Sequence, residues 1–456
     1  MHKLISWVTD CVNNKMNATF ARKLYKLIQH IRGEKVFECL SELEQTQWYP
    51  VEKLKDIQWK KIKAIITHAY DNVPYYRQKF DEHGINPNKI KDLSDLKYIP
   101  ILNKKELREN APRLIAKDRK YRFSQDVTSG SLGPATTVFT DRNAAAFQHA
   151  AVFRAYRWMG LDIGDKIARF WGTQLDVKRK IKDLIKDFLL NRITFSTHFL
   201  DDKTMFSYYQ KLKNFKPRAI YGFTSAIYEF AQFIFRNELP IKNLDIKTII
   251  TTGELLFSYQ RQVIEKTFNC RVYNEYGCAE FGPIAYECPH GNLHIMAENL
   301  YVEIENQTDD GRGELIITEL NNFVMPLIRY KLGDIGIVSY SKCTCGRELP
   351  VLKEISGRAL DFVKTPDGRV IHGIYFDYLP KYFLGEIRQF QIVQEEIHTI
   401  CVNIVKDSGF NKHTLQKFEK KLREVVGTKV DIIFEFKEAI PRENTGKFHF
   451  VISKLP

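Results

Sequence analysis

The sequence predicts an α/β protein. It has a large N-terminal domain with mixed or parallel sheets flanked by helices, a β-rich subdomain, and a small mobile α+β C-terminal domain. Two observations predict this fold class. Between residues 167 and 273, short β-branched or apolar segments alternate with helical segments, which favours parallel strands joined by crossover helices. From about Leu300 the strand-like segments become shorter and follow one another directly.

The first elements that the sequence predicts are helices. Up to about Pro50 the chain has a basic, helical pattern, like an appended arm. From Lys60 to Tyr70 the apolar residues recur at helical spacing. This helix should stop before Pro74, because a proline disfavours the helical conformation in the residue that precedes it. Residues 136–140 then have the β-branched composition of a strand.

The alternating region predicts four strands, at residues 167–171, 219–221, 248–252 and 271–273, with helices at 225–235 and 258–268. Strands at 301–304, 313–318 and 335–340 form the β-rich subdomain. In the last hundred residues, strands at 389–393, 400–405 and 430–436 accompany a helix at 412–426. These changes divide the chain into a basic helical arm (1–50), a large domain (51–356) and a small C-terminal domain (357–456).

Composition and charge narrow the class of protein. Of the 456 residues, 44% are hydrophobic and 27% are charged, as in soluble globular proteins. No apolar run is long enough to cross a bilayer and no secretory leader is evident, so we expect a cytoplasmic protein. The net charge of +14 favours anionic partners such as nucleotides and coenzymes. No nucleic-acid-binding module is recognisable, so no nucleic-acid partner is expected.

Part of the positive charge is concentrated in two segments. Residues 1–35 contain seven lysines and arginines against two acidic residues, and five more bases lie between Lys178 and Lys186. Both segments have apolar residues at helical spacing beside the bases. Two interpretations stay open, a solvated helix face or a peripheral contact with a membrane.

Three motifs carry chemical groups suited to a nucleotide. The run from Thr128 to Gly133 is rich in glycine and hydroxyl groups, and such a loop can cradle phosphates or be an ordinary turn. It is not the Walker motif, because no Gly-Lys-Ser/Thr follows. Glu280, in a loop after a predicted strand, can bind Mg²⁺, and Tyr276 can stack on a base. Asp334, after a glycine turn, can accept hydrogen bonds from ribose.

The order of these motifs resembles that of the adenylate-forming acyl/aryl-CoA ligase superfamily. The series continues through Gly253-Glu254, Gly357–Asp361 and Pro441–Lys447. The chain is most similar to the phenylacetate–CoA ligase branch, which includes relatives from capsule and surface-polysaccharide gene sets. A His-Ala-Tyr-x-x-Val-Pro-Tyr-Tyr run within residues 65–108 adds to this resemblance, which covers roughly residues 50–456.

The resemblance implies a role for each matching residue. The loop that covers the phosphates of ATP would consist of Thr128, Ser129, Gly130, Ser131 and Gly133. Gly253, Glu254, Tyr276 and Gly277 would border adenine, Asp334 would bind the ribose, and Arg358 would approach the nucleotide. Glu280 would hold Mg²⁺, and Lys447 would reach the carboxylate and the α-phosphate. The acyl pocket would include Tyr221, Gly222, Phe223 and Phe281.

Three positions depart from the superfamily pattern. Leu132 stands where the phosphate loop usually has a hydroxyl residue, and Ala279 replaces the usual Thr or Ser before the metal-binding glutamate. Leu360 occupies a position where a charged hinge residue is usual. A hydroxyl bonded to phosphate is worth about 1–3 kcal/mol, so these changes would slow adenylation without abolishing it.

A metal site is expected on a second set of residues. Cys288, His290, Cys343 and Cys345 offer the thiolate and imidazole ligands that suit structural Zn²⁺, and His294 can substitute for His290. Similar sets occur in some members of the resembled branch. The alternative interpretation is that these are ordinary thiols, either buried or exposed.

We therefore expect an ATP- and Mg²⁺-dependent, AMP-forming ligase that activates a small carboxylate as an acyl-adenylate and transfers it to CoA. One alternative is a CoA-independent amide or ester ligase that modifies a surface or capsular polysaccharide precursor, with an amine or a sugar as acceptor. Another alternative, motivated by Leu132 and Ala279, is a non-catalytic nucleotide-binding protein.

Overall fold

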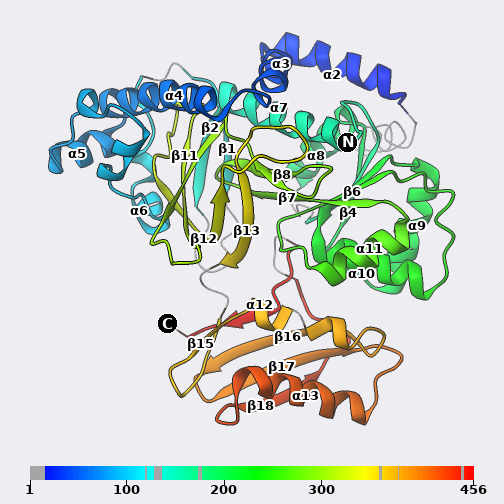
Figure 1. Cartoon of the computed structure of the whole chain (residues 1–456). Helices are drawn as coiled ribbons and strands as arrows, with labels where there is room; N and C mark the ends of the chain where they lie inside the picture. The colour runs from blue at the N-terminus through cyan, green and yellow to red at the C-terminus, as the bar shows by residue number, and fades with distance from the viewer. Residues whose placement is uncertain are drawn as a thin grey trace.

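A computed structural model of the chain describes residues 16–118, 121–127, 136–172, 177–358, 362–377, 379–442 and 446–455. It is an α/β fold, as predicted (Figure 1). The predicted phosphate loop, Thr128 to Gly133 with Leu132, lies outside the described residues, as do Leu360 and Asp361.

One sheet of eleven strands runs through the large region, in the order β10-β11-β12-β13-β9-β8-β7-β6-β5-β3-β4. Strands β4, β3, β5, β6 and β7 are parallel, and pairing is antiparallel from β7 to β10. The predicted β-rich subdomain therefore continues the same sheet. The strands are β3 (Ile167–Trp171), β4 (Arg192–Ser196), β5 (Ala219–Phe223), β6 (Thr248–Thr252), β7 (Arg271–Cys278), β8 (Gly282–Glu287), β9 (Leu293–Ile295), β10 (Leu300–Glu305), β11 (Gly313–Glu319), β12 (Tyr330–Ser339) and β13 (Val351–Arg358).

Helices cover both faces of the parallel half. One face packs against α7, and the other packs against α9, α10 and α11 in a separate apolar cluster. The helix predicted to stop before Pro74 ends at Asn72. The helices of the large region are α2 (Ala18–Arg32), α3 (Val36–Thr46), α4 (Val51–Asn72), α5 (Pro74–Glu82), α6 (Lys104–Glu109), α7 (Arg142–Trp158), α8 (Val177–Leu189), α9 (Asp202–Phe215), α10 (Thr224–Arg236) and α11 (Ser258–Phe268). Two further strands, β1 (Phe123–Val127) and β2 (Thr137–Asp141), pair antiparallel.

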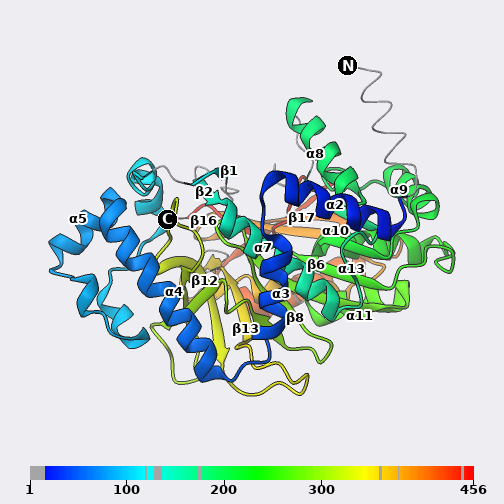
Figure 2. The same ribbon diagram turned by 90° about the horizontal axis from the view of Figure 1, so that it is seen from above.

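The predicted N-terminal arm is only partly an appendage. Val36, Leu40 and Leu43 of α3 are buried in the same apolar cluster as α7. At this junction Arg154 and Glu298, both fully buried, form an ion pair of 2.6 Å. If one partner of such a pair were removed, the other would be left as an unpaired buried charge. The ion pair therefore holds α7, and α3 that packs on it, to the rest of the large region. Helix α2 lies further out, beside α8 (Figure 2).

The C-terminal region folds around its own apolar cluster below the large region (Figure 1). Its sheet has the order β18-β17-β16-β19, in which only β16 and β17 are antiparallel to each other. Helix α13 covers this sheet, because Phe418 and Leu422 point into its cluster. Its elements are β14 (Phe362–Lys364), β15 (Val370–His372), α12 (Ile374–Asp377), β16 (Ile387–Glu396), β17 (Thr399–Lys406), α13 (Lys412–Val426), β18 (Asp431–Phe436) and β19 (Val451–Ser453).

Candidate active site

The C-terminal region contacts the large region where the parallel strands end. A Cβ built on Gly446 would lie 2.9 Å from Gly172 Cα, after β3, and 2.3 Å from Thr197 Oγ1, after β4. Thr197 Oγ1 donates a hydrogen bond of 3.2 Å to the Gly446 carbonyl. The carboxyl ends of parallel strands are the usual place for a ligand in an α/β sheet. The loop that contains Lys447 therefore closes over this edge.

Lys447 lies beside two residues that the resemblance assigned to the site. A Cβ built on Gly253, after β6, would lie 3.3 Å from Lys447 Cε. The Lys447 ammonium is 6.0 Å from the ring centre of Phe223, the last residue of β5. Gly253 also has a φ of +76°, which favours glycine. Residues nearly 200 positions apart in the sequence thus meet at one point.

Glu254 binds the C-terminal loop with its carboxylate. Glu254 Oε1 accepts hydrogen bonds from the Phe448 backbone N–H, at 2.8 Å, and from Ser225 Oγ, at 3.0 Å. Glu254 Oε2 accepts one from the Ser225 backbone N–H, at 2.7 Å. Arg442 also donates to Ser225 Oγ, at 2.7 Å, and forms a buried ion pair with Glu229. The sequence reasoning placed Glu254 near adenine but missed this contact between the two regions.

A second set of ion pairs links the regions away from Lys447. Arg236 of α10 pairs with Asp407, at 3.1 Å, just after β17. Arg388 of β16 pairs with Asp202 of α9, also at 3.1 Å. Ion pairs of this kind are worth little individually when exposed, so they orient the C-terminal region more than they hold it in place.

The other predicted nucleotide residues lie on β7, in the turn after it, and on the paired strands β12 and β13. The Tyr276 hydroxyl donates a hydrogen bond of 2.5 Å to Asp334 Oδ2, which joins β7 to β12. Strand pairing sets Asp334 opposite Arg358. Glu280, in the tight turn between β7 and β8, is buried and accepts a hydrogen bond of 3.3 Å from the Tyr330 hydroxyl. Gly277 faces the same turn, where a Cβ would lie 2.7 Å from the Gly282 carbonyl oxygen.

The predicted acyl-pocket residues divide into two groups. Tyr221 and Phe223 both stack on Trp171 of β3, with ring centres 5.8 and 4.3 Å away, and so form an aromatic wall. Phe281 instead packs in the apolar core against Tyr330. A Cβ on Gly222 would lie 2.2 Å from the Phe170 carbonyl oxygen, so this glycine allows β3 and β5 to pack closely. Its role is explained by packing.

Glu275 is a buried acid beside this wall to which the sequence analysis gave no role. Its Oε1 accepts hydrogen bonds of 3.2 Å from the Tyr221 hydroxyl and from Thr252 Oγ1. Burial raises the pKa of Glu275 to about 7. A glutamate directly before Tyr276, close to the end of the predicted strand 271–273, was the signal that could have identified it.

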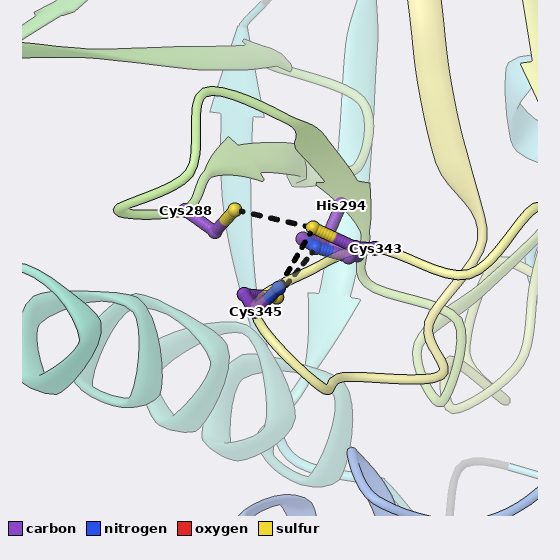
Figure 3. Close-up of side chains that lie close together, drawn as sticks. All are labelled: Cys288, His294, Cys343 and Cys345. Atoms are coloured by element: carbon purple, nitrogen blue, oxygen red, sulfur yellow. Dashed lines mark hydrogen bonds between the residues drawn. The ribbon is translucent and has the colours of Figure 1, made fainter.

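Three cysteines and one histidine form a separate cluster, to which the loop after β8, strand β9 and the loop between β12 and β13 contribute (Figure 3). The ligand atoms of Cys288, His294, Cys343 and Cys345 all lie within 4.8 Å of one another. The Cys288 and Cys343 sulfurs are 3.8 Å apart, and Cys345 Sγ is 3.3 Å from His294 Nε2. Two sulfurs bound to one tetrahedral zinc, each at about 2.3 Å, lie about 3.8 Å apart, so the residues fit this ion.

The surroundings of the cluster also suit a metal ion. His294 Nδ1 lies 3.0 Å from the Leu349 carbonyl oxygen, to which it can donate, and this leaves Nε2 for a metal. Backbone N–H groups of His290 and Cys345 donate to the Cys288 and Cys343 sulfurs. Of the two histidines that the sequence offers, His290 has an exposed ring that lies 2.9 Å from Thr344 Oγ1, outside this group, whereas His294, the alternative ligand, lies within it.

Comparisons with known proteins identify relatives of the whole chain. Residues 363–454 match the CapK C-terminal domain. The chain is 25% identical to Protein CapK of Staphylococcus aureus over 413 residues, which cover 88% of this chain and 90% of that protein. It is 24% identical to phenylacetate-coenzyme A ligase of Escherichia coli K12 over 427 residues, 88% of this chain and 95% of that protein.

A solved structure shares the fold. The crystal structure of 2-hydroxyisobutyryl-CoA ligase in the postadenylation state, in complex with 2-HIB-AMP, superimposes with a TM-score of 0.74. The two proteins are 20% identical, and the match covers 89% of this chain and 90% of that one. The chain therefore has the fold of this ligase, with both its large region and its C-terminal region.

Proposed function

We propose that this chain, a homologue of CapK and of the phenylacetate–coenzyme A ligases, is an ATP-dependent, AMP-forming ligase that activates a small carboxylate and transfers it to CoA. In the first step a carboxylate oxygen would attack the α-phosphorus of ATP, and pyrophosphate would leave. In the second step the CoA thiol would attack the acyl carbon and release AMP. The observation that carries this proposal is the contact of Lys447 with Gly253 and Phe223.

The position of Lys447 supports its role in the first step. Carboxylate attack on a phosphate brings anions together, and an ammonium fixed beside them stabilises the charge that develops. Lys447 belongs to the region that matches the CapK C-terminal domain, residues 363–454. We propose that the whole small domain covers residues 357–456. We propose that it rotates about residues 358–361 after adenylation, so that CoA can approach.

The nucleotide would bind along the strand ends next to Lys447. Thr128, Ser129, Gly130, Ser131 and Gly133 would surround the phosphates. Gly253, Glu254, Tyr276 and Gly277 would border the adenine, and Asp334 would take the ribose hydroxyls, with Arg358 nearby. Mg²⁺ would be held by Glu280, and this ion would neutralise phosphate charge during the reaction. The hydrogen bond between Tyr276 and Asp334 supports a shared role for these two residues.

The test is carboxylate-dependent exchange of labelled pyrophosphate into ATP, measured with the full chain over a panel of carboxylic acids. We expect exchange with at least one acid, and a thioester once CoA is added. Exchange without any thioester, but with an amide or ester formed on an amine or sugar, would favour the CoA-independent alternative. No exchange with any acid, in protein that binds ATP, would contradict the enzyme proposal and support a nucleotide-binding protein.

We also propose that Cys288, His294, Cys343 and Cys345 hold a structural zinc ion. The separations of the donor atoms and the hydrogen bond available to His294 Nδ1 support this proposal. The ion would join the loop after β8 to the loop between β12 and β13. All four ligand positions would come from the protein, as in structural sites, so no role in the reaction is proposed for it. Metal analysis of the purified protein is the direct measurement.

A specific observation favours a peripheral membrane contact through α2. Phe20, Leu27 and Ile31 lie on one stripe of this helix and are 58%, 55% and 73% exposed. The opposite face, with Ala21 and Tyr25, is buried against the protein. Among the described residues, no helix has the length and apolar character to span a membrane. An exposed apolar stripe on a helix that is also basic is typical of helices that lie in the bilayer interface.

We propose that α2 and the basic helix α8 beside it bind an anionic bilayer, on the cytoplasmic face where ATP is available. Lys23 and Lys26 flank the stripe and complement anionic lipids. The test is sedimentation of the full chain with vesicles of phosphatidylcholine that contain or lack 30% phosphatidylglycerol, a composition chosen as roughly that of an anionic membrane.

Binding should require the anionic lipid and should be lost in a Leu27→Glu/Ile31→Glu variant. Phe206→Glu, at an exposed phenylalanine of α9, is the matched control and should bind like the wild type. If neither vesicle binds the wild-type chain, the membrane proposal is wrong. A concentration-dependent dimer that Leu27→Glu/Ile31→Glu abolishes would show instead that a second copy covers the stripe.

A further inference from the structure

The aromatic wall of the acyl pocket continues to a cationic side chain, Arg169 of β3. Strand pairing sets Arg169 beside Tyr221 of β5, and the Arg169 guanidinium lies 5.5 Å from the ring centre of Trp171. Residues 169 and 171 are two apart on a strand, so both side chains point to the same face of the sheet. From Arg169 the wall runs through Trp171 and Phe223 to Lys447. The aromatic wall therefore has a cation at each end.

Among the described residues, Arg169 has no ion-pair partner within hydrogen-bond distance. Its neighbour Arg192 takes Asp187, with Arg192 Nε 2.7 Å from Asp187 Oδ1, and Thr194 Oγ1 donates to Asp187 Oδ2 at 2.6 Å. The contact of Arg169 in this network is with a neutral group, since Arg169 Nε donates to Thr194 Oγ1 at 3.2 Å. Within the part of the chain that the structure describes, no carboxylate forms an ion pair with Arg169.

The surroundings make this charge costly. Burial, and then the nearby Arg192, lower the pKa of Arg169 to about 10, and the attraction of Asp187, Tyr221 and Asp183 offsets this lowering only in part. Another acid near the wall, Glu275, accepts its hydrogen bonds from Tyr221 and Thr252. A guanidinium taken out of water without an anion is unfavourable, and an incoming anion would remove that penalty. Guanidinium groups also bind carboxylates with good geometry, because their N–H groups form a planar fork.

We propose that Arg169 determines specificity by binding a second anionic group, at the end of the substrate opposite the carboxylate that is activated. The substrate class is then a dicarboxylic acid with a flat or slender body, which would lie along Trp171, Tyr221 and Phe223 with one carboxylate near Lys447. This inference rests on the proposed function. It adds the chemical class of the acid, which an apolar pocket for an aryl monocarboxylate would not select.

The test compares acids that differ only in the distal group. The pairs are phenylacetate with 4-carboxyphenylacetate, and hexanoate with adipate. Pyrophosphate exchange is measured with wild-type protein and with Arg169→Met, Arg169→Lys and Arg218→Met, the last at a half-exposed arginine outside the pocket. Binding of the same acids without ATP is measured by calorimetry, so that a second readout does not depend on turnover.

The wild type should prefer the dianionic acid of at least one pair by about tenfold or more in kcat/KM, mainly through KM, since one charged hydrogen-bonded contact is worth about 1.5–3 kcal/mol. Arg169→Met should lose that preference and the calorimetric signal, Arg169→Lys should keep part of both, and Arg218→Met should match the wild type. Circular dichroism confirms that the variants are folded.

Three outcomes separate this inference from the proposed function. Exchange with monocarboxylates that is equal to or better than exchange with their dianionic partners, and unchanged in Arg169→Met, would overturn the role of Arg169 and leave the ligase proposal intact. Binding of dianionic acids that depends on Arg169, without exchange, would support the subsite and contradict the ligase proposal. If Arg169→Met does not fold, Arg169→Lys and the wild-type preference decide the question.

Discussion

The Phe448 backbone N–H donates a hydrogen bond of 2.8 Å to Glu254 Oε1. The residue that follows the proposed catalytic lysine is thus tied to the residue that follows Gly253. Every residue except proline keeps the backbone donor at position 448, so the contact is best tested at the acceptor, Glu254. The contact ties closure of the C-terminal region to the strand end where the adenylate would form, and it divides the proposed reaction into separately testable halves.

Lys447→Ala should lower the exchange rate by about a hundredfold or more, because the charge that develops on the phosphate loses its ammonium. ATP binding, measured by calorimetry, should change little. Lys437→Ala, at a half-exposed lysine of the same region that pairs with Glu435, is the matched control. Wild-type exchange rates in Lys447→Ala would remove this lysine from the mechanism.

Glu254→Ala should slow adenylation about tenfold or more, because the acceptor for Phe448 and Ser225 is lost and the closed arrangement becomes less favourable. The reaction of preformed acyl-adenylate with CoA should be affected less, since we propose that this step follows rotation of the small domain. Rapid-quench measurement of each half-reaction checks the prediction. An equal loss in both halves would show that Glu254 does not act through closure and would leave its proposed place beside the adenine as its role.

His294→Ala should lower the zinc content from about one ion per chain to a small fraction and should lower the melting temperature, since a structural zinc contributes directly to folding. His290→Ala should retain the ion, because the His290 ring lies outside the cluster. Atomic emission on both purified variants decides between the two histidines. Full zinc occupancy in His294→Ala would contradict the ligand set.

Glu275→Gln should change how stability depends on pH. Burial raises the pKa of Glu275 to about 7, above its ordinary value of 4.5, so the folded state holds a proton that the unfolded state releases. The free energy of unfolding contributed by this group is therefore full below pH 4.5 and is lost as the pH rises through about 7. The variant should gain stability relative to the wild type over this interval, by on the order of 3 kcal/mol.

Urea unfolding at pH 5 and pH 8 measures this difference. Glu395→Gln, at an exposed glutamate that pairs with Lys454, should behave like the wild type at both pH values. The same stability difference between Glu275→Gln and the wild type at the two pH values would show that the folded carboxyl is already ionised at pH 5.

Local pattern was enough to predict most of the secondary structure. The predicted helix at 258–268 and strands at 167–171 and 248–252 agree with α11, β3 and β6 residue for residue. Burial explains the agreement for the two strands, because strands covered on both faces are rich in apolar and β-branched residues. The pattern could not show that the strands after Leu300 extend the same sheet, because strand pairing is not written in the hydrophobic period.

The site was less accessible from the sequence. Motif order identified Lys447 and Gly253, and the structure brings them together. The choice of His294 over His290 depends on the path of the loop after Cys288, which spacing alone did not determine. Arg169 belongs to no motif. Its proposed role depends on the ion pair between Asp187 and Arg192, which can be recognised only when the neighbours of each charged group are known.

The close contact between the two regions at Gly446 requires a residue without a side chain. A Cβ built on Gly446 would lie 2.3 Å from Thr197 Oγ1, so even an alanine there would clash between the C-terminal region and the large region. In a Gly446→Ala variant the two regions would not close fully. The variant should fail to form the acyl-adenylate, but it should still bind an acyl-adenylate that is supplied to it. Such a variant would be suited to crystallising the protein with its C-terminal region not fully closed.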